Sequence, residues 1–346
     1  MITRIHVSWT VLLVSLLAYP LFASNFFVLQ IGAYSMILGV IGLSLMVLAG
    51  YGGMVSLSQL TVAGVAGYSV AILGENSSGV MGLGWSPWVV VFCAVILASI
   101  SAALIGVISV RTKGIYTIMI TLAITVAFFY FVRQNYDVFN GFTGFSGIKA
   151  PIIFGFNLNQ PTPFYYATLV VTFLCLWAVI FASRSVFGLT LQALRDNPRR
   201  MQALGYNVKG HKIFAHFLSG VMAAIAGVLL VWFNSRISPG SVGINVALDI
   251  LVIAVIGGLR HPIGPFLGAL LFVLLENFAI DFFVEDRFNT VIGAVFLTIV
   301  LFSPDGLLGL WEKASSFLGL APLTKFDKSQ LAIKNGVNLN KQSEKL

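Results

Sequence analysis

Ten long apolar runs constrain the fold of this chain more than any other feature. A helix needs roughly 20 residues to cross a hydrocarbon core about 30 Å thick. The runs cover residues 7–23, 27–49, 59–74, 87–110, 114–132, 164–183, 211–233, 246–258, 262–280 and 289–303. With 58% hydrophobic residues in 346, the chain has more apolar surface than one soluble core can hide. We therefore predict an all-α, polytopic integral membrane protein with about ten transmembrane helices.

Alternating the runs from a cytoplasmic N-terminus divides the 20 Lys and Arg residues unequally. Four fall outside, namely Arg133, Lys149, Arg236 and Arg287. The other sixteen fall inside, namely Arg4, Arg111, Lys113, Arg184, Arg195, Arg199, Arg200, Lys209, Lys212, Arg260 and the six lysines from Lys313 onward. Cytoplasmic loops carry an excess of basic residues, so both termini are predicted to be cytoplasmic. The net charge of +8 is then an orientation signal, and no nucleic-acid partner is expected.

Two domains of unequal size follow from this topology. Residues 1–322 form a transmembrane domain whose longest cytoplasmic loop is 184–210. Residues 323–346 are polar and rich in Lys and Asn, which predicts a disordered cytoplasmic tail. The first run lacks a clear cleavage site, so we expect it to remain as a transmembrane helix and not to be a signal peptide.

Two glycine-rich stretches interrupt the apolar pattern and predict broken or re-entrant segments. The first has Gly50, Gly52 and Gly53, followed by the polar residues Ser56, Ser58, Gln59 and Thr61. The second has Gly257, Gly258, Pro262, Gly264, Pro265 and Gly268. Broken backbone is tolerated at membrane depth where protein or water covers it. We interpret the four polar residues of the first stretch as part of a translocation pathway, whereas Gly264 and Gly268 fit either a pathway or close helix packing.

Asp249 and Glu276 are the acids placed within the apolar runs. A carboxylate in lipid costs a few kcal/mol, so both side chains should face the protein interior or an interface. Two roles remain open for them. They could cap broken backbone or pair with a partner subunit, or they could contact the ammonium group of an amino acid in the pathway.

The loop at 184–210 contains the signals of a short helix. Asn197 can cap its start, Pro198 suits the first helical position, and Gly205 suits a left-handed stop after Leu204. Met201 and Leu204 are three residues apart and should share one side of this helix of about seven residues. It could insert an apolar tip into a groove on a soluble partner, or its arginines could hold it against lipid headgroups.

Five sequence blocks resemble the branched-chain amino acid ABC transporter permeases of the LivM type. The loop reads "ALRDNPRRMQALGYNV", against A-I-R-E-x-x-x-A-A-x-A-L-G-I-N-V in that family. Arg195, Ala203, Leu204, Gly205, Asn207 and Val208 match; Asp196 replaces another acid, and Arg200 and Met201 replace an alanine pair. The other blocks are "AGYGGMVSLSQLTVAGVAGYSVAIL" (49–73), "RTKGIYTIMITLA" (111–123), "DILVIAVIGGLRHPIGPFLGALLFVLLE" (249–276) and "LFSPDGLLGL" (301–310).

The resemblance implies one membrane subunit of an importer in a bacterial-type inner membrane. Its expected partners are a second permease subunit, two cytoplasmic ATP-binding subunits, an extracytoplasmic substrate-binding protein and the lipid bilayer. The chain has no G-x-x-x-x-G-K-[ST] motif, so ATP and Mg²⁺ should be bound by the partner ATPases and no cofactor by this chain. The resemblance assigns coupling to these ATPases to Arg195, Asp196, Asn197, Arg199, Met201, Leu204 and Gly205.

Other functions are less consistent with the sequence. A proton-coupled secondary transporter would use Asp249 or Glu276 as its titrating group and would need no ATPase. An enzyme is disfavoured because the H-E-x-x-H and G-x-S-x-G motifs are absent and the four histidines show no metal-ligand spacing. Within the ABC class, the resemblance favours branched-chain or other hydrophobic amino acids, with urea or short amides as the alternative.

Overall fold

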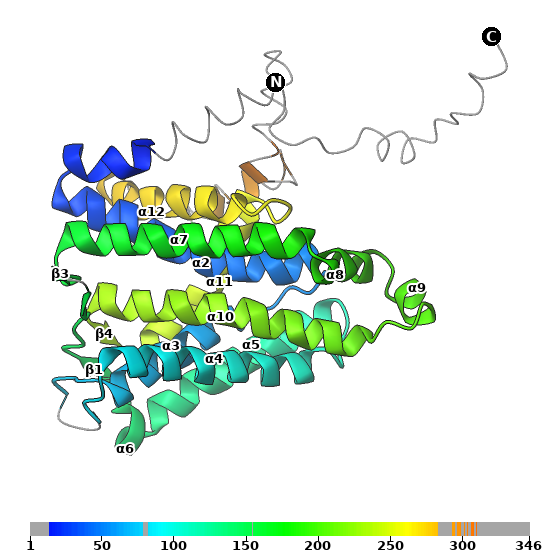
Figure 1. The fold of residues 1–346 in the computed structure, drawn as a ribbon, viewed down its shortest axis with the longest axis horizontal. Coiled ribbons are helices and arrows are strands. Elements are labelled where there is room, and N and C mark those ends of the chain that lie inside the picture. The colour runs from blue at the N-terminus through cyan, green and yellow to red at the C-terminus, as the bar shows by residue number, and fades with distance from the viewer. Residues whose placement is uncertain are drawn as a thin grey trace, which may run out of the picture.

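The computed structural model describes residues 14–78, 82–153 and 155–282, together with isolated positions between 293 and 309. Long helices lie side by side across these ranges and form one elongated bundle (Figure 1). The helical elements are η1 (Phe27–Ala33), α2 (Tyr34–Met46), η2 (Val47–Tyr51), α3 (Gln59–Leu73), α4 (Pro87–Ser109), α5 (Ile115–Gln134), α6 (Tyr136–Phe139), α7 (Pro161–Arg184), α8 (Val186–Asp196), α9 (Pro198–Ala203), α10 (Val208–Asn234), η3 (Pro239–Val242), α11 (Ile244–Gly257) and α12 (Gly264–Phe282). Of these, η1 and η2 are π-helical and continuous with α2, and η3 is a 3₁₀ turn.

The helices follow the apolar runs closely. Eight of the ten predicted runs coincide with described helices, with ends that shift by a few residues. Within the described residues, five helices are long and apolar enough to cross a membrane, and α3, α11 and α12 are shorter apolar helices. The prediction of an all-α membrane protein is therefore confirmed.

Three predictions fall wholly or partly outside the described residues. Only residues 14–23 of the first run are described, and residues 14–22 are helical. The tenth run is described at scattered positions, and the tail at 323–346 and the basic residues Arg4 and Arg287 are not described. The count of ten helices and the cytoplasmic position of the termini stay predictions.

Four two-residue strands, paired as two small antiparallel sheets, add a minor β component. β1 (Phe145–Ser146) pairs with β4 (Arg236–Ile237), with Phe145 opposite Ile237. β2 (Ile152–Ile153) pairs with β3 (Phe156–Asn157). The β1–β4 ladder fastens the segment after α6 to the segment after α10. Both segments therefore belong to one end of the bundle, opposite α8 and α9 (Figure 1).

The two ends separate the basic residues as the predicted topology requires. Three basic residues lie at the β1–β4 end. Arg236 is in β4, Lys149 follows β1, and Arg133 stacks over the ring of Phe142, which precedes β1. At the opposite end, Gly106 near the close of α4 packs against His216 near the start of α10. This contact places the α4–α5 turn, with its two basic residues, at the same end as α8 and α9.

α2 lies at the centre of the bundle because it is apolar on every side. It packs against α7, α10, α11 and α12, and Ile37, Ile41 and Leu45 have at most 1% of their surface exposed. A helix that is hydrophobic all round is stable only when buried on all sides. α2 is therefore the central buried helix, and the other helices pack around it.

Small side chains bring α10 close to α3 and α4. A Cβ on Gly227 would lie 2.2 Å from the carbonyl oxygen of Ala63 in α3, and one on Gly220 would lie 2.2 Å from Cβ of Ala102 in α4. Small residues permit such close approach between helices in membranes. Gly220 and Gly227 of α10 therefore pack against other helices of this chain.

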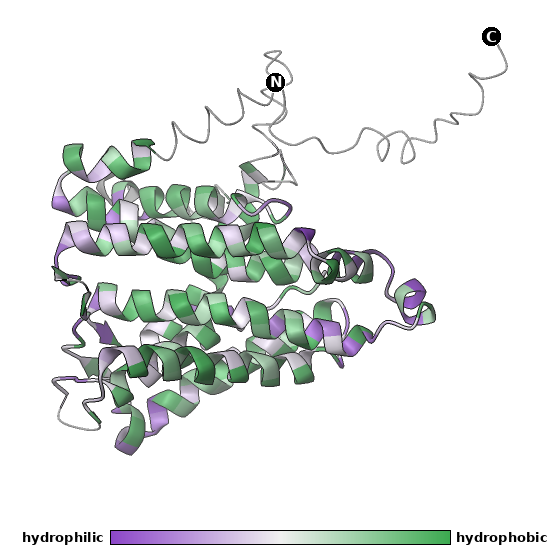
Figure 2. Ribbon diagram, viewed as in Figure 1, coloured by the Kyte–Doolittle hydropathy of each residue, from purple (hydrophilic) through white to green (hydrophobic). Residues whose placement is uncertain are grey.

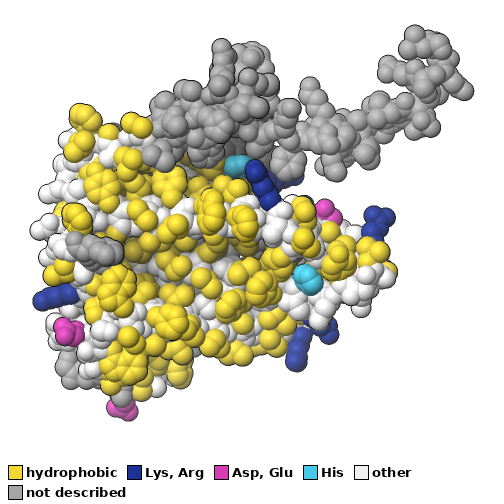
Figure 3. Space-filling view, viewed as in Figure 1, with side chains coloured by type: hydrophobic (Ala, Val, Ile, Leu, Met, Phe, Trp, Pro, Cys, Tyr) yellow, Lys and Arg dark blue, Asp and Glu magenta, His cyan; other side chains and the backbone are white. Residues whose placement is uncertain are grey.

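The outer surface of the bundle is apolar over most of its length (Figures 2 and 3). α4 and α5 are the most exposed spans, and α4 presents Trp88, Phe92 and Leu104 at its surface. In a soluble protein an apolar area of this size would cause association. Along membrane-spanning helices it is the surface expected to face lipid.

Two spans are interrupted where glycines predicted a break. α3 has 15 residues and α11 has 14, so each reaches only about 21–23 Å, short of the hydrocarbon core. Residues 52–58 form the irregular segment before α3, and residues 258–263 form the one between α11 and α12. The helices thus end at both predicted breaks, and most residues of the two irregular segments are buried or half-buried, whereas Gly53 and Arg260 are exposed.

The second break is held by direct backbone packing. A Cβ on Gly268 would lie 2.0 Å from the carbonyl oxygen of Ile253, and one on Gly264 would lie 2.2 Å from that of Gly258. Gly258 itself has φ of +109°, which ends α11. Gly264 and Gly268 therefore serve close helix packing, one of the two interpretations left open by the sequence.

Candidate functional site

The predicted loop at 184–210 folds into two consecutive helices, α8 and α9, at one end of the bundle (Figure 1). α8 begins at the end of α7, where the hydroxyl of Ser185 accepts a hydrogen bond from the Gly188 backbone N–H at 3.3 Å. The side-chain amide of Gln192 donates to the carbonyl oxygens of Ser183 and Gly188 at 3.1 and 3.2 Å. These bonds fix α8 at the terminus of a membrane-spanning helix.

α9 begins and ends at the predicted residues. The side chain of Asn197 accepts from the Arg200 backbone N–H at 3.0 Å, and Pro198 occupies the first helical position. Gly205 has φ of +87°, and the Tyr206 N–H reaches back to the carbonyl oxygen of Met201. The capping and stop signals are confirmed, and α9 has six residues instead of about seven.

The apolar surface of α9 differs from the prediction. Met201 is 8% exposed and faces its neighbours, whereas Leu204 is 66% exposed. The prediction assumed helical geometry through Leu204, but α9 ends at Ala203 and the chain turns at Gly205. The apolar side chains available to a partner are therefore Leu204 and the half-exposed Tyr206.

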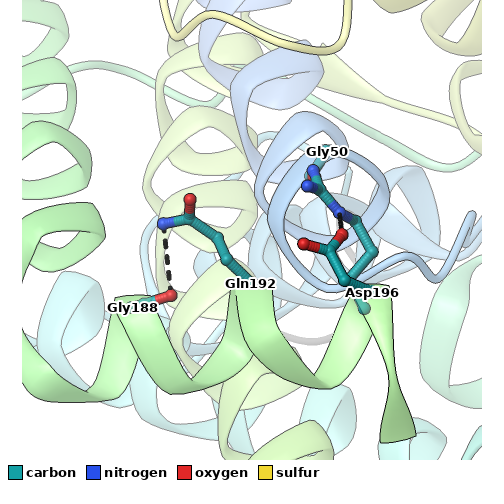
Figure 4. Close-up of polar contacts among 5 residues, drawn as sticks. Gly50, Gly188, Gln192 and Asp196 are labelled. Carbon is teal, nitrogen blue, oxygen red and sulfur yellow. Dashed lines mark hydrogen bonds and ion pairs between the residues drawn. The ribbon is translucent and has the colours of Figure 1, made fainter. Parts of the chain in front are cut away.

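Arg195 turns toward the bundle, whereas the residues that follow it, 196–200, are exposed. Its Nη1 donates to the backbone carbonyl oxygen of Gly50, and its Nε donates to the Asp196 carboxylate at 2.9 Å. These two bonds bring Gly50 of η2 and Asp196 at the end of α8 to the same guanidinium group (Figure 4). Arg199 and Arg200 are exposed on α9. Of the predicted coupling residues, Arg195 bonds to the bundle and Met201 is buried, whereas the others are exposed, namely Asp196, Asn197, Arg199, Leu204 and Gly205.

The four polar residues predicted in the first break are fully buried and hydrogen-bonded. Ser56 and Ser58 share a hydrogen bond of 2.9 Å, and Thr61 donates to Thr125 of α5 at 2.9 Å. Gln59 accepts from Ser44 of α2 at 3.2 Å. This polar cluster lies where α2, α3 and α5 meet, and whether solute passes beside it stays a prediction.

The partners of this cluster did not stand out in the sequence. Thr121 accepts from the Leu57 N–H at 3.1 Å, and Thr125 donates to the Leu57 carbonyl oxygen at 3.2 Å. α5 thereby satisfies the irregular backbone of the break, which cannot bond within a helix. Thr117, Thr121 and Thr125 recur every four residues along α5 and are all buried. That spacing on a lipid-exposed helix was the available signal.

Asp249 and Glu276 lie in the neighbouring helices α11 and α12. Both are half-buried, and Glu276 Oε2 is buried without a hydrogen-bond partner within the part of the chain that the structure describes. No hydrogen bond joins either acid to the polar cluster among the described residues. Whether these two acids line a pathway stays a prediction.

Comparison with known proteins identifies the bundle. The family model for "branched-chain amino acid transport system / permease component" matches residues 27–300, which include the broken spans and the α8–α9 segment. The chain belongs to this permease family. Its relatives are transport permeases, so it is a membrane permease component and not an enzyme. No solved structure matches it.

Three relatives show the range of the permease family. The high-affinity branched-chain amino acid transport system permease protein LivM of Escherichia coli is 24% identical, with 96% of this chain and 78% of the relative covered. The probable branched-chain amino acid transport permease protein LivH of Methanocaldococcus jannaschii is 27% identical, with 83% and 84% covered. The nucleoside ABC transporter permease protein NupC of Lactococcus lactis is 24% identical, with 66% and 74% covered.

Proposed function

We propose that this permease is one membrane subunit of an ATP-driven importer for branched-chain or other hydrophobic amino acids. The observation that carries the proposal is α9, a capped helix that projects from the basic end of a permease-family bundle. Arg199, Arg200 and Leu204 are exposed there. A surface of this kind suits docking to a soluble subunit, and the chain has no phosphate-binding loop of its own.

The basic end of the bundle supports a cytoplasmic position for α8 and α9. The importer would then contain two ATP-binding subunits on that side, which bind ATP and Mg²⁺. A second, related permease subunit would complete the pathway as a heterodimer. An extracytoplasmic binding protein would deliver the substrate to the β1–β4 end, in the inner membrane of a bacterial-type cell.

Relatives named for branched-chain amino acid transport support the proposed substrate class. Other relatives are named for nucleoside and ribose transport, so substrates of other chemical classes stay open. Urea and short amides are the alternative substrates within the same mechanism. A proton-coupled carrier is a second candidate because Glu276 holds a buried carboxylate oxygen that has no hydrogen-bond partner among the described residues.

Reconstitution of the permease with its candidate ATPases, second permease and binding protein tests the proposal. We expect uptake of labelled leucine, isoleucine or valine into proteoliposomes to require ATP on the α9 side. Competition by unlabelled amino acids, urea, acetamide and a nucleoside would rank the substrates. Strong competition by urea alone would replace the amino acid assignment with the amide one.

The same proteoliposomes separate the ATP-driven mechanism from the proton-driven one. Imposing a proton gradient without ATPase subunits should give no uptake above protein-free liposomes. Uptake under those conditions, lost in a Glu276→Gln variant, would instead support the proton-coupled carrier and reject the proposed function.

A further inference from the structure

Arg195 links the cytoplasmic segment to the first break in the membrane domain. Its guanidinium bonds to the backbone of Gly50, 145 residues earlier in the chain. A hydrogen bond from a charged donor is stronger than one between neutral groups. With 39% of its side chain exposed, Arg195 is only partly available to any other subunit.

Gly53 packs closely against the same side chain. A Cβ at this position would lie 2.6 Å from Cγ and 3.3 Å from Cβ of Arg195. Gly53 also has φ of +65°, a conformation that other residues adopt at a cost. Glycine is therefore required here both for the backbone and for the approach of α8.

The first break in turn contacts the second. A Cβ on Gly50 would lie 2.0 Å from the carbonyl oxygen of Leu259, in the segment between α11 and α12. Gly50 lies in η2, the helical turn that leads into the first irregular segment, so this turn meets the second irregular segment, about 200 residues later in sequence, next to the Arg195 contact. Movement of α8 would reach both breaks through this one point.

The apolar side of α8 borders both a packed cluster and a cavity. Leu191 of α8 packs with Leu48, Met54 and Ala215 in a small buried cluster. Beside this cluster lies an apolar cavity of about 310 Å³, lined in part by Tyr51, Phe187, Leu191 and Ala215. Protein interiors are otherwise close-packed, so the cavity gives α8 room to shift. η2, the last turn of the helix Phe27–Tyr51, also lines this cavity and is π-helical, a feature that often occurs at functional sites.

We propose that Arg195 is a positioning residue that transmits movement of α8 to the two breaks, through its hydrogen bond to Gly50 and its packing contact with Gly53. The inference rests on the proposed function and adds to it that Arg195 acts inside the membrane subunit. ATPase subunits would contact α9, and α8 would carry the displacement into the bundle.

The test measures uptake per ATP hydrolysed in the reconstituted importer. Arg195→Gln should keep the ATPase subunits bound but lower this ratio about tenfold, the factor expected when a charge-assisted hydrogen bond is lost. Arg195→Lys should recover part of the ratio because a cation remains. An unchanged ratio in Arg195→Gln would overturn the inference.

Gly53→Ala provides an independent test with a matched control. Gly114 also has positive φ, +58°, but a Cβ there would meet nothing within 4 Å. Gly53→Ala should therefore lower the ratio severalfold while Gly114→Ala stays close to wild type. Equal effects of the two substitutions would show that backbone strain, and not the lost contact with Arg195, lowers the ratio. That result would overturn the inference.

Subunit retention separates this inference from the proposed function. If the ATPases co-purify with wild type and with Gly53→Ala but not with Arg195→Gln or Arg195→Lys, Arg195 contacts the ATPase and the transmission role is wrong. If they never co-purify with wild type and uptake needs no ATP, the proposed function fails first. Non-additive effects of Gly53→Ala and Arg195→Gln in the double variant would support a shared contact, and additive effects would contradict it.

Discussion

Replacing Gly268 with leucine should largely prevent this permease from folding. A Cβ at Gly268 would lie 2.0 Å from the carbonyl oxygen of Ile253 and 2.8 Å from the Gly257 nitrogen. Neither backbone atom can move unless α11 and α12 separate. Overpacking a filled interior costs about 1–3 kcal/mol or more, against a total stability of about 5–15 kcal/mol. We expect Gly268→Leu to lower the free energy of unfolding by about 3 kcal/mol or more.

Size-exclusion chromatography of a fluorescent fusion in detergent would measure the folded fraction. Gly240→Leu is the matched control because a Cβ at Gly240 would have only the Ser238 hydroxyl within 4 Å, at 3.7 Å. We expect that control to give a single sharp peak, as wild type should, and Gly268→Leu to aggregate. A sharp peak and wild-type melting temperature for Gly268→Leu would show that α11 and α12 do not pack as described.

Gly205→Trp should leave the permease folded but release it from the proposed ATPase subunits. Gly205 has φ of +87°, and nothing lies within 4 Å of a Cβ built there, so the substitution disturbs no packed interior. It does strain the turn after α9 by about 1–2 kcal/mol and places an indole beside Leu204. We expect co-purification of the ATPases to fall at least about tenfold, the change that roughly 1.4 kcal/mol produces.

Gly155→Trp is the control for Gly205→Trp. Gly155 has φ of +83° and is equally free of neighbours, but it lies between β2 and β3 at the opposite end of the bundle. Retention of the ATPases by Gly155→Trp and their loss from Gly205→Trp would assign the contact to the α9 end. If Gly205→Trp retains the ATPases and transports normally, α9 is not their docking site.

Features that depend on local sequence were predictable. Apolar runs located the helices because the bilayer sets the length of a span. Asn197, Pro198 and Gly205 marked both ends of α9 because caps and left-handed stops depend on a few neighbouring residues. The glycine-rich breaks were also found, since no continuous helix accommodates them well.

Features that depend on distant contacts were not predictable. α8 was treated as loop, although Leu191 and Leu194 are buried three residues apart on its inner face. Arg195 was assigned to the same surface as Arg199, but its partner, Gly50, is identified only once the first span is placed beside α8. Likewise, the threonines of α5 gain their role because they complete a backbone that lies about 60 residues earlier.

The docking of ATPase subunits at α9 is the central claim, and cysteine cross-linking tests it most directly. Cys93 and Cys175 are both free thiols, so they would first be replaced with alanine. A cysteine would then be introduced at Leu204 or at Phe142, which are exposed equally at opposite ends of the bundle. We predict that Leu204→Cys reacts with membrane-impermeant thiol reagents only from the cytoplasmic side and cross-links to an ATPase subunit, whereas Phe142→Cys does neither. Labelling of Leu204→Cys from outside the cell, or an ATPase cross-link through Phe142→Cys alone, would contradict the account.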